Sequence, residues 1–175
     1  MGHNAGTILE NARGGTSLFV DFAERIAKPL QMEDFALRYC RYQRGGDSIH
    51  PAYIFRMSAR DLARFGLLYL RRGAWNGRQI VPADWVAESL VSYSNAGRGG
   101  YGYMWWVSRQ GRLIGNLELP GEHFAAQGNK GQIIFVYPQL DLVVVHRVDS
   151  RIPGKEIPNS QIGELLRRII AARAS

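Results

Sequence analysis

The most distinct hydrophobic pattern in the chain spans residues 132–148. Two runs rich in β-branched and aromatic residues, 133–137 and 142–145, flank a short segment that begins with Pro138 and ends with Asp141. Pro fixes φ and Asp can bond its own backbone, so the pattern predicts a β-hairpin with its turn at these residues. Neither run alternates with polar residues. We therefore expect other elements to cover both faces of the hairpin, as in the middle of a layered α/β domain.

Helix-capping residues, helix breakers and apolar spacing delimit five predicted helices: residues 5–12, 17–28, 58–72, 82–90 and 160–173. Ser58 followed by Asp61 forms a variant of the capping box, and Gly73 ends that helix. The last helix carries one apolar stripe able to lie across a sheet, formed by Ile162, Leu165, Leu166, Ile169 and Ile170.

Gly and Pro residues separate the remaining segments. Residues 31–57 are expected to form a loop, with breakers at 45–48 and 50–51. Asn76-Gly77 is a tight-turn signal. A glycine-rich link, 97–102, leads into a predicted strand at 103–107. A turn at Gly111 then joins this strand to a predicted partner strand at 112–117. A loop at 120–130 then precedes the central hairpin. The predicted order is helices, an antiparallel meander of four strands, and one covering helix.

Length and composition fit one folded domain of the α/β class (α+β type), with a helical part at about 5–92 and a sheet plus C-terminal helix at about 101–174. The 175 residues are 46% hydrophobic and 21% charged, and no stretch approaches the ~18 apolar residues of a membrane span. The single Cys40 can form neither an internal disulfide nor a zinc knuckle. The first residues lack a signal-peptide pattern, which makes the cytoplasm the default expectation and leaves localisation open.

The formal net charge of +7 raises the question of nucleic-acid binding, because clustered basic residues neutralise phosphates. All but three of the 22 basic residues are Arg, and they are scattered singly or in pairs. No nucleic-acid motif occurs, so nucleic acid is not expected as a partner. A membrane is not expected either, because no stretch is apolar enough to span one.

Motifs with a known chemical mechanism are absent from the sequence. No Ser is followed by Lys three residues later, no Gly-x-Ser-x-Gly occurs, and the four His residues lack metal-ligand spacing. The glycine-rich link is not followed by Lys-Ser or by a helix, as a phosphate loop would be. We therefore predict no metal and no cofactor.

Six segments of the chain carry a distinctive pattern. One is Met57-Ser-Ala-Arg-Asp-Leu-Ala-Arg-Phe-Gly-Leu-Leu-Tyr-Leu70. The others are 26–32, 73–77, 80–86, 101–106 and 128–132. Together and in their order along the chain, they resemble the serine β-lactamase-like hydrolases, a family that includes class C β-lactamases, D-Ala-D-Ala carboxypeptidases and related esterases; Gln31 stands where the family has Gly. The resemblance covers nearly the whole chain but matches only the C-terminal half of the family's domain, so it implies a partial β-lactamase/transpeptidase-like fold.

The resemblance also implies where catalytic groups belong. The family's nucleophile motif Ser-x-x-Lys and its Tyr-x-Asn are both expected to precede residue 1. Tyr93-Ser-Asn95 spells the second motif but follows segments that the family's motif precedes, so a polar loop is the favoured interpretation. No catalytic residue is therefore assigned.

The family's third element, Lys-Thr-Gly, falls on His123-Phe124-Ala125 when counted back from the Gly131-Gln132 junction. Lys and Thr are missing there, which favours a small ester, amide or peptide-like substrate over a penicillin. His123 is a candidate to face the cleft, the alternative being a histidine without a role. Gly128 and Gly131 would allow close backbone approach, or serve only a turn.

Three hypotheses follow from the resemblance. The first is a truncated hydrolase domain that is inactive alone. The second is one half of a split or longer active hydrolase, whose parent would also fit the periplasm. The third is a binding or interaction module without chemistry. Removing half of a domain uncovers more than the ~1,600 Å² of a standard interface, so a homo-oligomer or association with a complementary fragment is expected.

Overall fold

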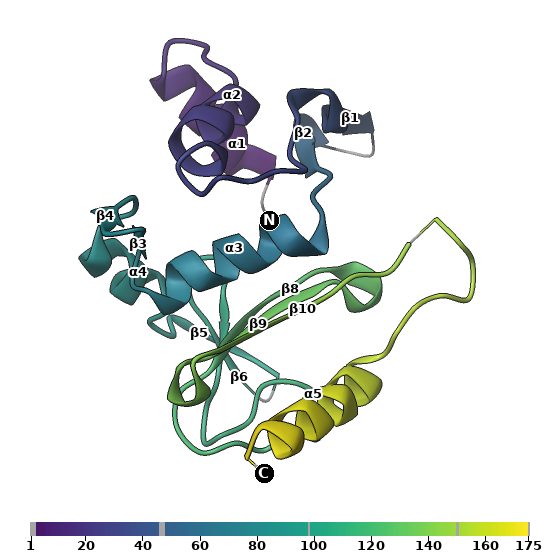
Figure 1. Cartoon of the computed structure of the whole chain (residues 1–175). Helices are drawn as coiled ribbons and strands as arrows, with labels where there is room; N and C mark the ends of the chain where they lie inside the picture. Colours follow the sequence, from purple (N-terminus) through teal and green to yellow (C-terminus); the bar gives the residue numbers. More distant parts are fainter. Residues whose placement is uncertain (1–2, 46–47, 98, 150, 175) are drawn as a thin grey trace. The chain divides into compact units, whose positions relative to one another are not determined.

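The computed structural model describes residues 3–45, 48–97, 99–149 and 151–174 (Figure 1). The chain forms two compact units, residues 1–64 and residues 65–175. Each unit has its own secondary structure and is described by itself. The interpretation of the chain as a single partial domain stays a prediction.

The first unit begins with helix α1 (His3–Ala12), followed by α2 (Leu18–Phe22), which continues into one π-helical turn, η1 (Ala23–Ala27). The Ser17 Oγ accepts a hydrogen bond from the Phe19 N–H at 3.3 Å, so Ser17 is the cap of the second helix, whereas the sequence allows either Thr16 or Ser17.

Residues 31–57 do not form a loop, contrary to the expectation from sequence. They contain the short helix η2 (Leu37–Tyr39) and an antiparallel hairpin of β1 (Cys40–Gly45) and β2 (Ser48–Phe55). Tyr42 lies opposite Tyr53 in this hairpin, and both rings pack on Phe19 of α2. Pro51 lies within β2 although it has no N–H to donate to a neighbouring strand. The hairpin tolerates it because the register shifts near it and Pro51 has no paired residue on β1. The predicted breakers Gly46 and Asp47 lie outside the described residues.

Glu10 and Asp61 hold the first unit together. The Glu10 carboxylate accepts hydrogen bonds from the Tyr42 hydroxyl at 2.7 Å and the Tyr53 hydroxyl at 3.0 Å, joining α1 to the hairpin. The buried Asp61 carboxylate accepts from the backbone N–H groups of Glu33 and Asp34, each at 3.1 Å. A carboxylate can accept several hydrogen bonds at once, so each of these side chains links segments that lie far apart in the sequence.

Helix α3 (Ala59–Leu70) begins and ends where the sequence predicts. The Ser58 Oγ accepts from the Asp61 N–H at 3.1 Å. At the other end, Gly73 has a φ of +84° and its N–H reaches the Leu68 carbonyl at 2.7 Å. The Gly73 conformation is one that a residue with a side chain rarely adopts, and this explains the glycine there.

Two short predicted features follow in the second unit. Strands β3 (Ala74–Trp75) and β4 (Arg78–Gln79) are joined by Asn76-Gly77, with φ values of +47° and +76°, which confirms the tight turn. Helix α4 (Ala83–Ser89) confirms the short helix, and Pro82 precedes it as the cap residue.

In the described residues of the second unit, six strands form one antiparallel sheet in the order β10-β9-β8-β7-β6-β5. They are β5 (Ser94–Ala96), β6 (Gly99–Tyr101), β7 (Trp106–Val107), β8 (Phe124–Gln127), β9 (Ile133–Tyr137) and β10 (Leu142–His146). Neighbours in the sequence are neighbours in the sheet. The meander and its central hairpin are confirmed, whereas the number of strands was underestimated.

Three segments differ from their predicted form. The expected strand at 103–107 is reduced to two residues, because Met104 has a φ of +66° and breaks the extended chain. Residues 112–117 form no strand and instead place Ile114 and Leu117 in the core. The expected loop at 120–130 contains β8. The strand forms because it pairs with β7 and β9, which its short apolar sequence does not reveal.

Helices cover both faces of the sheet, as the hairpin pattern predicts (Figure 1). All five residues of β9 are buried. On one face, residues 65–70 of α3 approach closely, since a Cβ on Gly66 would lie 2.7 Å from Val143 Cγ1 and 2.9 Å from Ile134 Cγ2. On the other face lies α5 (Asn159–Ala174) over a cluster of fully or almost fully buried residues: Ile114, Leu117, Ala125, Ile133, Phe135, Tyr137, Ile162 and Leu166.

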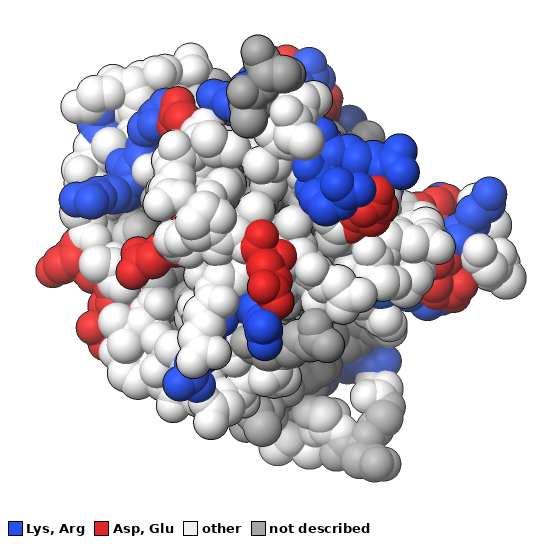
Figure 2. Space-filling model, turned by 90° about the horizontal axis from the view of Figure 1, so that it is seen from below, with Lys and Arg blue, Asp and Glu red and all other residues white. Residues whose placement is uncertain are grey.

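Charged side chains are interspersed on the face that Figure 2 presents, where Lys and Arg lie beside Asp and Glu. Within α5, Glu164 pairs with both Arg167 and Arg168 at 2.7–2.8 Å. These pairs lower the pKa of Glu164 to about 2. Among the described residues, no helix is both long and apolar enough to cross a membrane.

Candidate functional site

Strand β8 and the turns at its two ends hold all five residues predicted to contact a substrate. Its neighbours β7 and β9 fix its place inside the sheet by pairing Phe124 with Val107 and Val136. The loop before it ends at His123, and the turn after it contains the short helix η3 (Asn129–Gly131). The structure therefore brings the predicted residues together along one strand and its turns.

The His123 side chain points into the protein. It is 1% exposed and lies between the Phe135 and Tyr137 rings, at centroid distances of 5.7 and 5.8 Å. Within the described residues, neither ring nitrogen has a hydrogen-bond partner. Burial lowers the pKa of His123, because it penalises the charged imidazolium. The backbone of the nearby Gly121 raises the pKa of His123 by a smaller amount, although it lies outside hydrogen-bond geometry with the ring.

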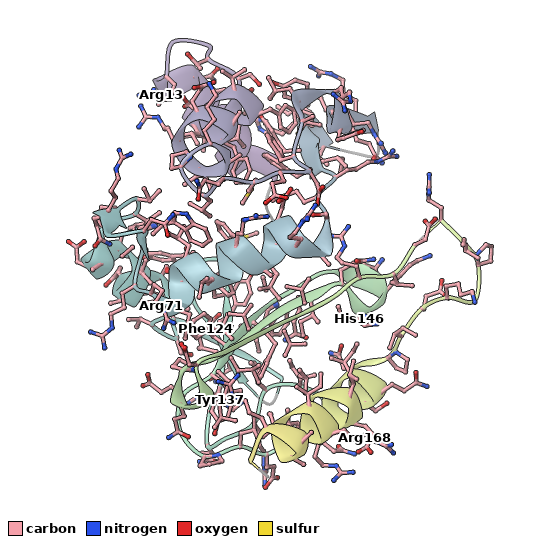
Figure 3. All side chains as sticks on the ribbon, in the orientation of Figure 1. Arg13, Arg71, Phe124, Tyr137, His146 and Arg168 are labelled. Atoms are coloured by element: carbon pink, nitrogen blue, oxygen red, sulfur yellow. The ribbon has the colours of Figure 1, made fainter. Side chains whose placement is uncertain are left out.

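Phe124 and Ala125 are also buried and point to opposite faces of the sheet. Phe124 packs edge-on against Trp105 at 5.2 Å, whereas Ala125 belongs to the cluster beneath α5. Figure 3 shows Phe124 and Tyr137 among the side chains of the sheet. If these residues contact a substrate, they would do so through backbone groups, and their role stays a prediction.

The turn after β8 depends on its glycines. The Gly128 N–H donates to the Gln132 carbonyl at 2.8 Å, which closes the turn. Gly131 has a φ of +89°, and a Cβ there would lie 2.9 Å from both the Cβ and the carbonyl oxygen of Ile157. The Gly131 carbonyl contacts His146 Nδ1 at 2.7 Å. Gly131 is thus required by the turn itself, and close approach of a ligand stays a prediction.

Sequence reasoning placed residues 120–130 in a loop and so missed β8, including Ala126 and Gln127 at its end. Gln127 is the polar side chain at the end of the strand, and its Oε1 accepts from Asn159 Nδ2 at 3.2 Å. A polar residue that follows an apolar run and precedes glycine is the signal that could have revealed this strand end.

Tyr93-Ser-Asn95 lies at the start of β5, on the last strand of the sheet order. The Tyr93 hydroxyl donates to Glu88 and the Asn95 amide oxygen accepts from Arg109. The pKa of Tyr93 is raised well above its usual value, mainly because its hydroxyl donates a hydrogen bond to the Glu88 carboxylate that a phenolate could not make. The Tyr93 hydroxyl is thus engaged by a carboxylate of its own unit.

The described residues contain neither a serine nucleophile paired with a base nor a metal site. No hydrogen bond there joins a Ser hydroxyl to a His ring or a Lys amine. In the same part of the chain, no group of three His, Cys, Asp or Glu side chains could hold a metal ion. The geometry offers a strand, β8, that is paired on both sides and is followed by a glycine-containing turn, and its contact with a ligand stays a prediction.

The fold is a mixed α/β architecture in which helices cover an antiparallel sheet, and it is shared with solved structures of β-lactamase type. A Bacteroides dorei protein provisionally assigned as a beta-lactamase matches with a TM-score of 0.62 and 17% identity, over 94% of this chain and 54% of that one. A Bacillus anthracis protein provisionally assigned as a 6-aminohexanoate-dimer hydrolase matches with a TM-score of 0.54 and 20% identity, over 87% of this chain and 36% of that one.

The sequence places the chain within a family. The Beta-lactamase family matches residues 1–155, and the chain belongs to it. An uncharacterized protein of Alkalihalophilus pseudofirmus is 32% identical over 101 residues, which cover 54% of this chain and 30% of that protein. The chain thus spans about a third to a half of the length of these relatives. The predicted family resemblance is confirmed.

Proposed function

We propose that the chain is the C-terminal part of a β-lactamase-like serine hydrolase domain, in which β8 and its turns form one wall of an acyl-hydrolysing cleft. The observation that carries the proposal is the family match over residues 1–155 on a chain that covers only 30–54% of its relatives. The substrate class proposed is a small ester or amide, because His123-Phe124-Ala125 lacks the Lys and Thr that would bind a penicillin-like carboxylate.

The chain alone is proposed to be inactive. Its sequence has no Ser-x-x-Lys, and the hydroxyl of Tyr93 is bound by Glu88 rather than placed beside a nucleophile. Removing a nucleophile or its base costs about 10⁶-fold in turnover in a serine hydrolase, so only weak background catalysis would remain.

Hydrolysis of nitrocefin and p-nitrophenyl acetate by the purified chain tests this proposal. We expect no burst of product and no covalent labelling by a fluorophosphonate probe. Burst kinetics that Ser94→Ala abolishes would refute the inactive state, and Ser92→Ala serves as the neighbouring control. Reading the coding region upstream of Met1 for an in-frame Ser-x-x-Lys separates a split or longer hydrolase from a domain that has lost its chemistry.

The first unit supports the association of this chain with another polypeptide segment. Among its described residues, only three hydrophobic side chains are buried: Phe19, Ala27 and Leu30. In contrast, seven large hydrophobic side chains are exposed: Ile8, Leu9, Val20, Leu37, Tyr39, Tyr42 and Ile49. Exposed apolar groups on this scale favour burial against a partner, at about 25 cal/mol per Å² covered. The partner proposed is a complementary segment of the same domain or a second copy of this chain.

Sedimentation velocity over a hundredfold range of concentration tests the association. We expect self-association that Ile8→Glu and Ile49→Glu weaken, because each places a charge on the exposed apolar surface. Val91→Glu is a control on the second unit, where the side chain is also exposed. A monodisperse monomer at every concentration would argue against a second copy as the partner.

A further inference from the structure

Three aromatic rings form an exposed stack in the second unit, away from β8 in the sequence. Trp85 of α4 stacks on Tyr103 at a centroid distance of 5.4 Å, and Tyr103 stacks on Tyr93 at 5.1 Å with the rings almost parallel. The three side chains are 50%, 43% and 54% exposed, respectively. Large aromatic side chains are normally buried, so a stack left half in water is a surface suited to a ligand.

Two carboxylates flank this stack without a cationic partner. Asp84 and Glu88 lie four residues apart on α4, a spacing at which like charges repel. In the described part of the chain, neither one forms an ion pair, although most other carboxylates there do. The repulsion between them would be offset by a positive charge placed near both.

Hydrogen bonds fix these carboxylates in place. Glu88 Oε1 accepts from the Tyr93 hydroxyl and, at 3.3 Å, from the Tyr103 hydroxyl. Asp84 Oδ1 accepts from the backbone N–H of Trp85 at 2.8 Å. Both negative charges are therefore held beside the stack rather than free to move away from it.

A surface cavity of about 460 Å³ lies at this position and is lined by Pro82, Asp84, Trp85 and Glu88. We propose that this cavity binds a small organic ammonium ion of the trimethylammonium type, which rests on the Trp85 ring and is balanced by Asp84 and Glu88. A methylated ammonium suits the cavity because it is attracted to an aromatic face, loses little hydration on binding, and needs no hydrogen-bond acceptor. The site is independent of the proposed hydrolase function.

Titration with choline at low ionic strength, followed by calorimetry and by the NMR signal of the Trp85 indole, tests the site. The neutral carbon isostere of choline, in which a tert-butyl group replaces trimethylammonium, tests whether charge is recognised. We expect millimolar binding of choline and at least about fivefold weaker binding of the isostere, since an exposed cation–π contact contributes up to about 1 kcal/mol.

Three variants locate the site. Trp85→Ala is expected to weaken choline binding at least about fivefold, and Trp85→Phe to give an intermediate value because it keeps a smaller aromatic face. Glu88→Gln is expected to weaken binding several-fold at low salt and less at high salt. Glu122→Gln removes an exposed carboxylate elsewhere and serves as the matched control.

The proposal is overturned by any of three results. These are no binding of choline to the wild-type chain, equal binding of its neutral isostere, or an equal loss of affinity in Glu122→Gln and Glu88→Gln. Equal binding of the isostere would identify an apolar or sugar-like ligand instead.

Discussion

Replacing His123 by Leu is expected to stabilise the second unit. The ring is 1% exposed, and neither nitrogen finds a hydrogen-bond partner among the described residues. An unsatisfied buried polar group costs about 1–3 kcal/mol, and Leu has a similar volume without polar atoms. Since the ring carries two such atoms and repacking recovers only part of their cost, we expect the free energy of unfolding to rise by about 2 kcal/mol at pH 8.

The same substitution should change the dependence of stability on pH. Burial lowers the pKa of His123 in the folded state below the ordinary value of about 6.5. The unfolded chain therefore binds a proton first as the pH falls. Full stability is present above about pH 6.5, and it declines below that value by up to about 1.4 kcal/mol per pH unit until the folded-state pKa is reached. His123→Leu should remove this contribution.

Urea unfolding at pH 8 and at pH 5.5, followed by tryptophan fluorescence, measures both effects. All four Trp residues lie in residues 65–175, so the signal reports the second unit. His146→Leu is the matched contrast. It removes a histidine that does contact a carbonyl, that of Gly131, and should destabilise. A His123→Leu variant that is less stable than wild type at pH 8, or that keeps the full pH dependence, would refute the reasoning.

Three other substitutions test single contacts. Asp61→Ala leaves two backbone N–H groups without their acceptor and should cost about 3 kcal/mol, measured by circular dichroism of the helices during urea unfolding. Gly131→Ala places a side chain both at a positive φ and against Ile157, whereas Gly154→Ala places one at a positive φ in open space. The first substitution should therefore cost at least about 2 kcal/mol more than the second, and equal costs would contradict the clash. Gly66→Ala should cost about 1–3 kcal/mol by forcing α3 away from the sheet, and an unchanged urea midpoint would show that the helix moves freely.

Features that depend on a few neighbouring residues were predictable from the sequence. The cap at Ser58, the helix end at Gly73 and the turn at Asn76-Gly77 all follow from contacts within five residues, and each is found at its predicted place. The hairpin at 132–148 was predictable because its apolar runs and its turn lie next to each other in the chain. The family was likewise identified from short segments in a fixed order.

Features that depend on distant residues were decided by the tertiary structure alone. The β1–β2 hairpin exists because Tyr42 and Tyr53 pair across it and pack on Phe19, more than 20 residues earlier in the chain. Likewise, His123 could have faced a cleft or the core, and only the packing of β8 between β7 and β9 determined which. A strand exposes alternate residues to opposite faces, so the face each residue occupies follows from its register with the neighbouring strands, which the local sequence does not contain.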